Sequence, residues 1–239
     1  MMPGNVFRLQ LAAAFADTRH MILRIGVSAL LAMPFVFVGM PARAQAAGIV
    51  MVILFTGFFG AAVGHARMRS DSRLARLTLL PVSPVVLWLD LVLASALTRL
   101  APVVVVIAGF VLVNGRGVSP AGLIALLGLL CSSLIFVTLL GMGTGRLARS
   151  NGEVHLFGAM ACGLLAFVSG VTPIPERLTW LAATVAFNPI ARLLAALTRL
   201  AAEPASQSSA EFVLASLVLT AIAVATAFRW FAGGLAQKK

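Results

Sequence analysis

Long apolar segments alternate with short polar ones along most of this chain. Six of the apolar segments are about 20 residues long, which is the length a helix needs to cross the hydrocarbon core of a membrane. They cover residues 21–40, 46–64, 91–113, 121–143, 154–171 and 211–231. The pattern therefore predicts an all-α, polytopic integral membrane protein with six transmembrane helices in a single domain over residues 1–239.

A short amphipathic helix is expected ahead of the first span. Phe7, Leu11 and Phe15 recur every four residues, so they share one face of a helix. An apolar face next to polar residues is typical of a helix that lies in the membrane interface. We therefore expect an N-terminal interfacial helix that leads into the first span.

A second amphipathic helix is expected between the fifth and sixth spans, over residues 188–203. Asn188 is a good N-cap, and Pro189 is favoured at the first helical position. Arg192 and Arg199 share one face of this helix, and the apolar stripe on another face consists of Ile190, Leu193, Leu194 and Leu197. This outer helix is expected to lie in the outer leaflet or to form part of a re-entrant hairpin.

Composition narrows the class of protein. Hydrophobic residues make up 61% of the chain and charged residues only 10%, whereas a soluble domain carries roughly 25% charged residues. A soluble enzyme, a disordered chain and a disulfide-stapled secreted module are therefore excluded, and nucleic acid is not expected as a partner.

The excess of basic residues predicts the orientation in the membrane. Lys and Arg number 18 against 7 Asp and Glu. With six spans and both termini in the cytoplasm, the outer segments hold only Arg43, Arg116, Arg177, Arg192 and Arg199. The cytoplasmic segments then hold Arg8, Arg19, Arg24, Arg67, Arg69, Arg73, Arg76, Arg146, Arg149, Arg229, Lys238 and Lys239. The positive-inside rule thus favours a protein of the cytoplasmic (inner) membrane with both termini inside.

The sequence lacks the residues that several kinds of nucleotide-binding, metal-binding or catalytic site require. A phosphate-binding loop requires a lysine, and the chain has lysine only at Lys238 and Lys239. The three histidines form no metal-binding motif, and the two cysteines lie far apart in apolar segments. We expect no catalytic site, no metal and no cofactor, so the chain by itself is not expected to be an enzyme.

Two charged residues near or within the third span are candidates for an intramembrane function. Asp90 is expected close to the cytoplasmic surface, whereas Arg99 lies inside the span. Charged side chains within a span are costly and are often functional. The alternative is that Arg99 extends towards the lipid headgroups. Their separation of nine residues excludes an i, i+4 ion pair.

Small residues also recur at helix-packing spacing. Gly60 with Gly64 and Gly141 with Gly145 each place two glycines one turn apart. Such pairs allow two helices to approach closely, so they predict tight packing between spans.

The loop after the second span, residues 65–84, is the most charged part of the chain and has the features of a docking element. Ser70 or Asp71 can cap a short helix there. Leu74 and Leu77 would share one face of this helix, with Arg73 and Arg76 beside them. A solvated basic loop is the alternative; it explains the arginines but not the spacing of the leucines.

Two regions together resemble the permease subunits of type-2 ABC exporters. One is residues 67–84, a basic and acidic stretch followed by leucines and Pro81-Val82-Ser83. The other begins at Phe167-Val168-Ser169-Gly170, contains a proline turn and continues through Asn188-Pro189 to Arg199. The front half is also similar to the haem-exporter permease of cytochrome c maturation, through residues 7–11 and Leu79-Leu80-Pro81. Where the type-2 exporter permeases usually have Glu-Arg at the start of the loop, this chain has His65-Ala66-Arg67, so Asp71 is the only acid in the loop.

The resemblance implies the permease half of an ATP-driven transporter that exports a hydrophobic or amphipathic substrate. Its partners would be cytoplasmic ABC ATPase subunits, which bind the ATP, and a second permease copy or a similar permease. The coupling residues would be Arg69, Asp71, Arg73, Leu74, Arg76 and Leu77, and the outer-gate residues would be Asn188, Pro189, Arg192, Leu194 and Arg199. The alternative is a non-transporting subunit that anchors or scaffolds a larger membrane complex.

Overall fold

The computed structural model describes residues 5–114, 118–172, 185, 188–202, 221 and 225, and its regular elements in these ranges are all helices. Four helical segments are long and apolar enough to cross a membrane: α2 (Thr18–Phe37), the continuous segment Ala42–Ser70, α6 (Pro84–Asn114) and α7 (Pro120–Leu147). These correspond to the first four predicted spans. The expectation of an all-helical, multi-pass membrane protein is therefore confirmed.

The fifth and sixth predicted spans are not among these four segments. The fifth corresponds to α8 (Asn151–Val168), which is apolar but shorter than the other four. The sixth, at 211–231, lies outside the described residues apart from Ala221 and Ala225. A total of six spans remains a prediction.

The second span extends beyond its predicted end. The segment Ala42–Ser70 consists of α3 (Ala42–Leu54), a π-helical turn η1 (Phe55–Phe59) and α4 (Gly60–Ser70). The predicted loop over 65–84 therefore begins inside a helix. No proline or other helix breaker separates Gly64 from Ser70, so the charged residues continue the helix past its apolar part. The third span starts early because Pro84 is tolerated in a first helical turn.

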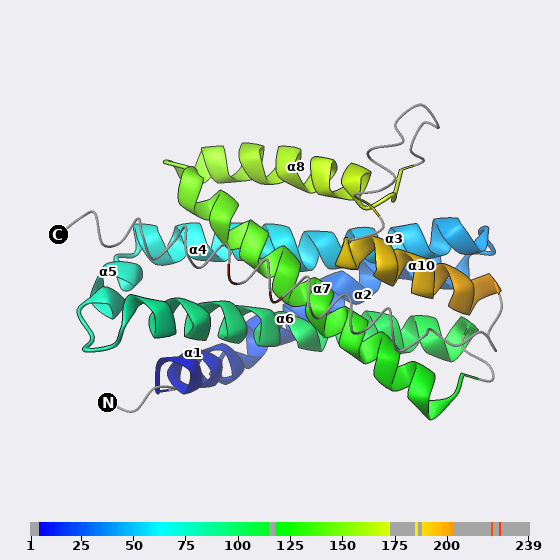
Figure 1. Ribbon diagram of the computed structural model, residues 1–239, viewed down its shortest axis with the longest axis horizontal. Coiled ribbons are helices and arrows are strands. Elements are labelled where there is room, and N and C mark those ends of the chain that lie inside the picture. Colours follow the sequence, from blue (N-terminus) through cyan, green and yellow to red (C-terminus); the bar gives the residue numbers. More distant parts are fainter. Residues whose placement is uncertain are drawn as a thin grey trace.

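The helices have two distinct ends (Figure 1). The start of α6, the end of α4 and the short helices α1 (Asn5–Ala16) and α5 (Arg73–Thr78) lie at one end. The starts of α3 and α7 and the helix α10 (Pro189–Ala202) lie at the opposite end. Between them, α7 crosses the segment α3–α4, and α8 packs against α4 and α7. The larger apolar core forms where α3, η1, α6, α7 and α10 meet.

Glycines bring α7 against the segment α3–α4, as the sequence predicted. A Cβ atom at Gly141 would overlap the backbone carbonyl of Phe58, and one at Gly145 would overlap that of Ala62. Close helix approach of this kind needs small residues. The pair Gly60 and Gly64 has a different role, because both face the side chain of Arg99.

A helix is present where residues 188–203 predicted one: α10 begins at Pro189 and ends at Ala202. The Asn188 carboxamide oxygen accepts a hydrogen bond from the backbone N–H of Ile190 (3.0 Å), as an N-cap does. The apolar stripe is buried against α3 and α7, and Leu193 and Leu197 are 0% exposed. The stripe therefore packs on the protein's own core; whether the helix also lies in the outer leaflet remains a prediction.

Candidate functional site

The short helix α5 joins the ends of α4 and α6. It begins after Ser72, which has a left-handed backbone conformation (φ 55°) and whose side chain makes no capping hydrogen bond. The expected cap at Ser70 or Asp71 is wrong. Asp71 instead ends α4, and the Ser70 hydroxyl donates to the carbonyl of Arg67 (2.9 Å). A left-handed residue lets the chain turn sharply between two helices, so α5 starts one residue later than the side chains suggested.

The two faces of α5 have different surroundings. Leu74 and Leu77 are half-buried and pack against a small core cluster that contains Leu87 and Trp88 of α6. Arg73 and Arg76 are exposed, and Leu79, just past the helix, is 84% exposed. The leucines expected to face a partner thus hold α5 to the protein, while the arginines and Leu79 face outward.

Arg69 links this region to another helix end. Its Nη1 donates to the carbonyl of Arg146 (3.1 Å) and its Nη2 to the carbonyl of Ala148. These carbonyls lie at the C-terminus of α7, where backbone acceptors lack intrahelical donors. Arg69 therefore fastens α4 to the junction between α7 and α8.

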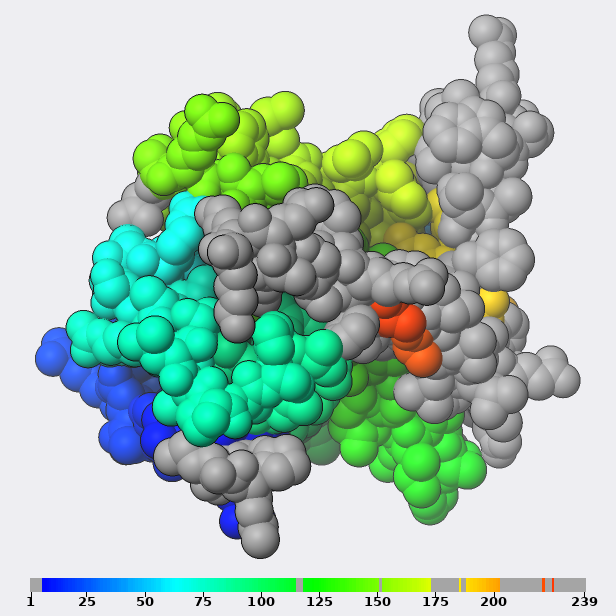
Figure 2. Space-filling view, turned by 60° about the vertical axis from the view of Figure 1, so that its left-hand side comes forward, coloured from blue at the N-terminus to red at the C-terminus, as the bar shows by residue number. Residues whose placement is uncertain are grey.

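Basic side chains gather at the end of the molecule that carries α5. Figure 2 turns this end forward, with the cyan and teal surface of α4, α5 and the start of α6 between α1 in blue and α8 in yellow-green. The arginines of α1, α4, α5, the start of α2 and the junction between α7 and α8 are Arg8, Arg19, Arg24, Arg67, Arg69, Arg73, Arg76, Arg146 and Arg149. The opposite end has Arg43, Arg192 and Arg199 among the described residues. The arrangement agrees with the charge asymmetry in the sequence.

Asp90 has a structural partner. Its carboxylate is buried (9% exposed) and accepts a hydrogen bond from the backbone N–H of Phe7 (3.3 Å). That N–H belongs to the first turn of α1, where a negative charge is favourable. Asp90 thus fixes the start of α1 against α6, a contact that the sequence did not indicate because 83 residues separate the two positions.

Arg99 lies at the midpoint of α6 and is buried, with 8% exposure. Its Nη1 donates to the carbonyl (2.6 Å) and to the hydroxyl of Ser95, one turn earlier. The rest of the guanidinium lies over Gly60 and Gly64 of α4. The side chain is therefore enclosed between helices, and the alternative that it extends to the lipid headgroups does not fit this packing.

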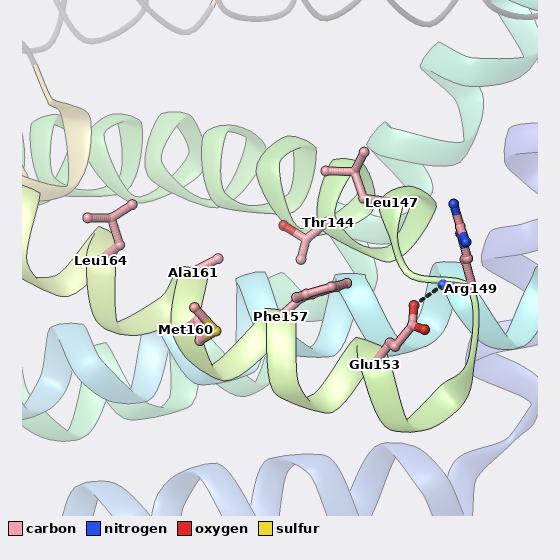
Figure 3. Close-up of a pocket in the computed structure, with 8 residues that line it drawn as sticks. All are labelled: Thr144, Leu147, Arg149, Glu153, Phe157, Met160, Ala161 and Leu164. Carbon is pink, nitrogen blue, oxygen red and sulfur yellow. Dashed lines mark hydrogen bonds between the residues drawn. The ribbon is translucent and has the colours of Figure 1, made fainter.

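An open groove of about 860 Å³ runs between α7 and α8 (Figure 3). Its walls are mostly apolar, and its residues are Thr144, Leu147, Arg149, Glu153, Phe157, Met160, Ala161 and Leu164. One end is charged. There Glu153 accepts a hydrogen bond from the backbone N–H of Arg149 (2.7 Å). The side chain of Arg149 is exposed and is not used in this hydrogen bond. The sequence did not predict this groove; its one local signal is the segment Ser150–Glu153, which resembles a capping box and marks the start of α8.

At the opposite end, polar contacts join three helix termini. The Asn188 amide donates to the hydroxyl of Ser169 (2.9 Å), and Arg43 of α3 donates to the carbonyl of Gly170 (3.2 Å). Ser133 of α7 donates to the carbonyl of Pro189 (3.1 Å). Leu194 is buried and Arg199 is exposed. The expected outer-gate residues are thus brought together on one short, firmly anchored helix.

Comparison with known proteins did not identify a family for the chain. No protein-family model matches it, and no curated protein is significantly similar to it. Within the described residues, no three His, Cys, Asp or Glu side chains are grouped closely enough to hold a metal ion.

Proposed function

We propose that this chain is the membrane-spanning permease half of an ATP-driven ABC exporter, energised by separate cytoplasmic ATPase subunits. The observation that supports this best is α5, a short amphipathic helix between two long apolar helices at the basic end. Its inner leucines pack on the protein, and its outer side presents two arginines and Leu79. The basic end is the cytoplasmic one in this proposal, in accord with the positive-inside rule.

The contacts of α5 would allow it to transmit the movement of a bound partner to the long helices. Leu74 and Leu77 tie it to α6, and Arg69 ties the preceding helix to the end of α7. A partner that displaces α5 would therefore act on α4, α6 and α7 together. Arg69, Leu74 and Leu77 are coupling residues from the inner side, while Arg73 and Arg76 contact the partner. Asp71, the only acid of this loop, lies where the chain turns into α5.

The exposed side of α5 sets the expected energetics of docking. Burying Leu79 in a groove of the ATPase would contribute about 1.5–3 kcal/mol. Each rim arginine would contribute about 0–1 kcal/mol, and less at high salt. The apolar contact should therefore outweigh the ionic contacts.

The substrate class follows from the groove between α7 and α8 and from the helix α10. Apolar walls with one charged end fit a hydrophobic or amphipathic molecule that enters sideways from the bilayer. In this proposal, α10 covers the outer mouth of the path between two permease copies. The second copy is either identical or a similar permease.

The test is to purify the tagged chain in mild detergent and to measure ATP hydrolysis by the captured complex. Leu79→Asp should reduce the captured ATPase activity about tenfold or more, because 1.4 kcal/mol corresponds to a factor of ten. Arg73→Ala with Arg76→Ala should reduce it less, and mainly at low salt, where the ionic contacts are least screened. Arg8→Ala, which removes an exposed arginine from the same end, is the matched control.

Two outcomes would contradict the proposal. A stable complex that contains no nucleotide-binding subunit would favour the alternative, a membrane anchor or scaffold. Equal losses for Arg8→Ala and for the Arg73/Arg76 variant, with no effect of Leu79→Asp, would mean that the basic end is only an electrostatic patch.

A further inference from the structure

The centre of α6 carries a cation that makes no ion pair within the described part of the chain. Arg99 lies 15 residues from either end of the 31-residue helix, so it sits near the middle of the span. Among the described residues it has no carboxylate partner. Asp90, the other charge of this helix, is engaged with Phe7. Arg24 of α2 adds a second positive charge to the electrostatic environment of Arg99.

Within residues 5–114, 118–172 and 188–202, only part of the Arg99 guanidinium is hydrogen-bonded. An arginine has five N–H donors. Ser95 accepts from Nη1 through both its carbonyl and its hydroxyl, whereas Nε and Nη2 meet no acceptor among the described residues. The edge formed by Nε and Nη2 offers two parallel N–H groups, the geometry that binds a carboxylate or phosphate with two hydrogen bonds. Within the described part of the chain, the two donors without an acceptor are parallel N–H groups, which can bind one anionic group through two hydrogen bonds.

Two glycines of α4, Gly60 and Gly64, present no side chain to this edge. A Cβ atom at Gly60 would stand 3.2 Å from Nε, and one at Gly64 would stand 3.2 Å from Nη2. Both distances are tighter than ordinary contact, so larger residues on this face of α4 would press on the guanidinium. The π-helical turn η1 comes directly before Gly60. Turns of this kind are frequent at functional sites.

From these observations we infer that Arg99 binds the anionic group of an amphipathic molecule between α4 and α6. The ligand class is a carboxylate or phosphate attached to an apolar chain, since the site lies within the apolar span and has one charged fork. The inference rests on the proposed function in one respect only: the bound molecule would be the transported substrate. A free inorganic anion shares the same headgroup chemistry, and the experiment separates the two.

The experiment measures equilibrium binding of radiolabelled dodecyl phosphate to the full chain in nanodiscs of phosphatidylcholine. Arg99→Gln should weaken binding at least tenfold. Arg99→Lys should weaken it less, because lysine keeps the charge but loses the two-pronged geometry. Arg8→Gln, which removes an exposed arginine at the basic end and outside the groove between α7 and α8, should leave the affinity unchanged. Dodecyltrimethylammonium, with the opposite charge, should not compete.

A second pair of variants tests the fork while retaining the charge. Gly64→Ala should weaken dodecyl phosphate binding severalfold, because the new methyl group displaces Nη2. Gly109→Ala on α6 is the control, since nothing lies within 4 Å of its Cβ position. Size-exclusion chromatography and thermal unfolding of every variant establish that it is folded.

The outcomes are distinct. If unlabelled dodecyl phosphate displaces the radiolabelled ligand at concentrations where inorganic phosphate does not, the site binds an amphipathic molecule. If both displace it equally, and this depends on Arg99, the site binds a soluble anion. Unchanged binding in Arg99→Gln overturns the inference. Glu211 is the acid at the start of the predicted sixth span. The inference is also overturned if Glu211→Gln lowers stability as much as Arg99→Gln and the double variant adds nothing, because Arg99 would then belong to an internal ion pair. None of these measurements requires an ATPase, so failure of the proposed function would leave this test intact.

Discussion

Two short amphipathic helices outside the long spans, α5 and α10, differ in how they are anchored. The apolar face of α10 is fully buried, and its N-cap contacts the end of α8. The leucines of α5 are only half-buried, its first turn has no side-chain cap, and Leu79 beside it is largely exposed. A helix that closes one end of a bundle can become part of the core. A helix that receives a partner has to keep one face free, and its own anchoring is correspondingly weaker.

The sharpest test of this comparison is whether the two helices lie on opposite sides of the membrane. In a variant with Cys131 and Cys162 replaced by serine, we expect Ser72→Cys to react with an impermeant maleimide only after the cells are opened. Ala195→Cys, on the exposed face of α10, should react in intact cells. Labelling of both positions from the same side would rule out the assignment of α5 and α10 to opposite faces.

The next largest effect is expected from core truncation. Leu197→Ala should destabilise the protein by about 2–5 kcal/mol, the usual range for a fully buried leucine. Leu77→Ala should cost less, because its side chain is already half-exposed. The folded fraction during titration with a denaturing detergent measures both. The control is Leu112→Ala, at a leucine that is 83% exposed. Equal losses of stability in Leu77→Ala and Leu197→Ala would show that α5 and α10 do not differ in how firmly they are anchored.

The smallest effect is expected at the two helix starts. Asn188→Ala removes the cap of α10 and should cost about 1 kcal/mol. Ser72→Gly should be neutral or slightly stabilising, since Ser72 makes no capping bond and glycine accepts a positive φ readily. Thermal unfolding of the two variants beside the wild-type protein gives the comparison. A clear loss of stability in Ser72→Gly would show that the start of α5 depends on its serine side chain.

The sequence predicted those features that depend on residues close together in the chain. The cap at Asn188, the stripe that includes Leu193 and Leu197, and the close approach at Gly141 all follow from local spacing. The features that it did not predict depend on the tertiary arrangement. Nothing near Asp90 indicates that its carboxylate meets the start of α1, and nothing near Gly60 indicates that it faces Arg99. The start of α5 was misplaced because the side chains of Ser70 and Asp71 look like caps, whereas the turn depends on the backbone conformation of Ser72.

The hydrogen bonds of Arg69 have a consequence for the order in which the chain is assembled during synthesis. The last turn of α7 emerges from the ribosome with carbonyls that its own helix cannot satisfy. Arg69, which donates hydrogen bonds to these carbonyls, precedes Arg146 by 77 residues and lies at the end of α4. The carbonyls at the end of α7 are therefore satisfied by a residue that precedes them in the chain, and this does not depend on α8. The position of the junction between α7 and α8 is thus fixed by a residue that precedes both helices.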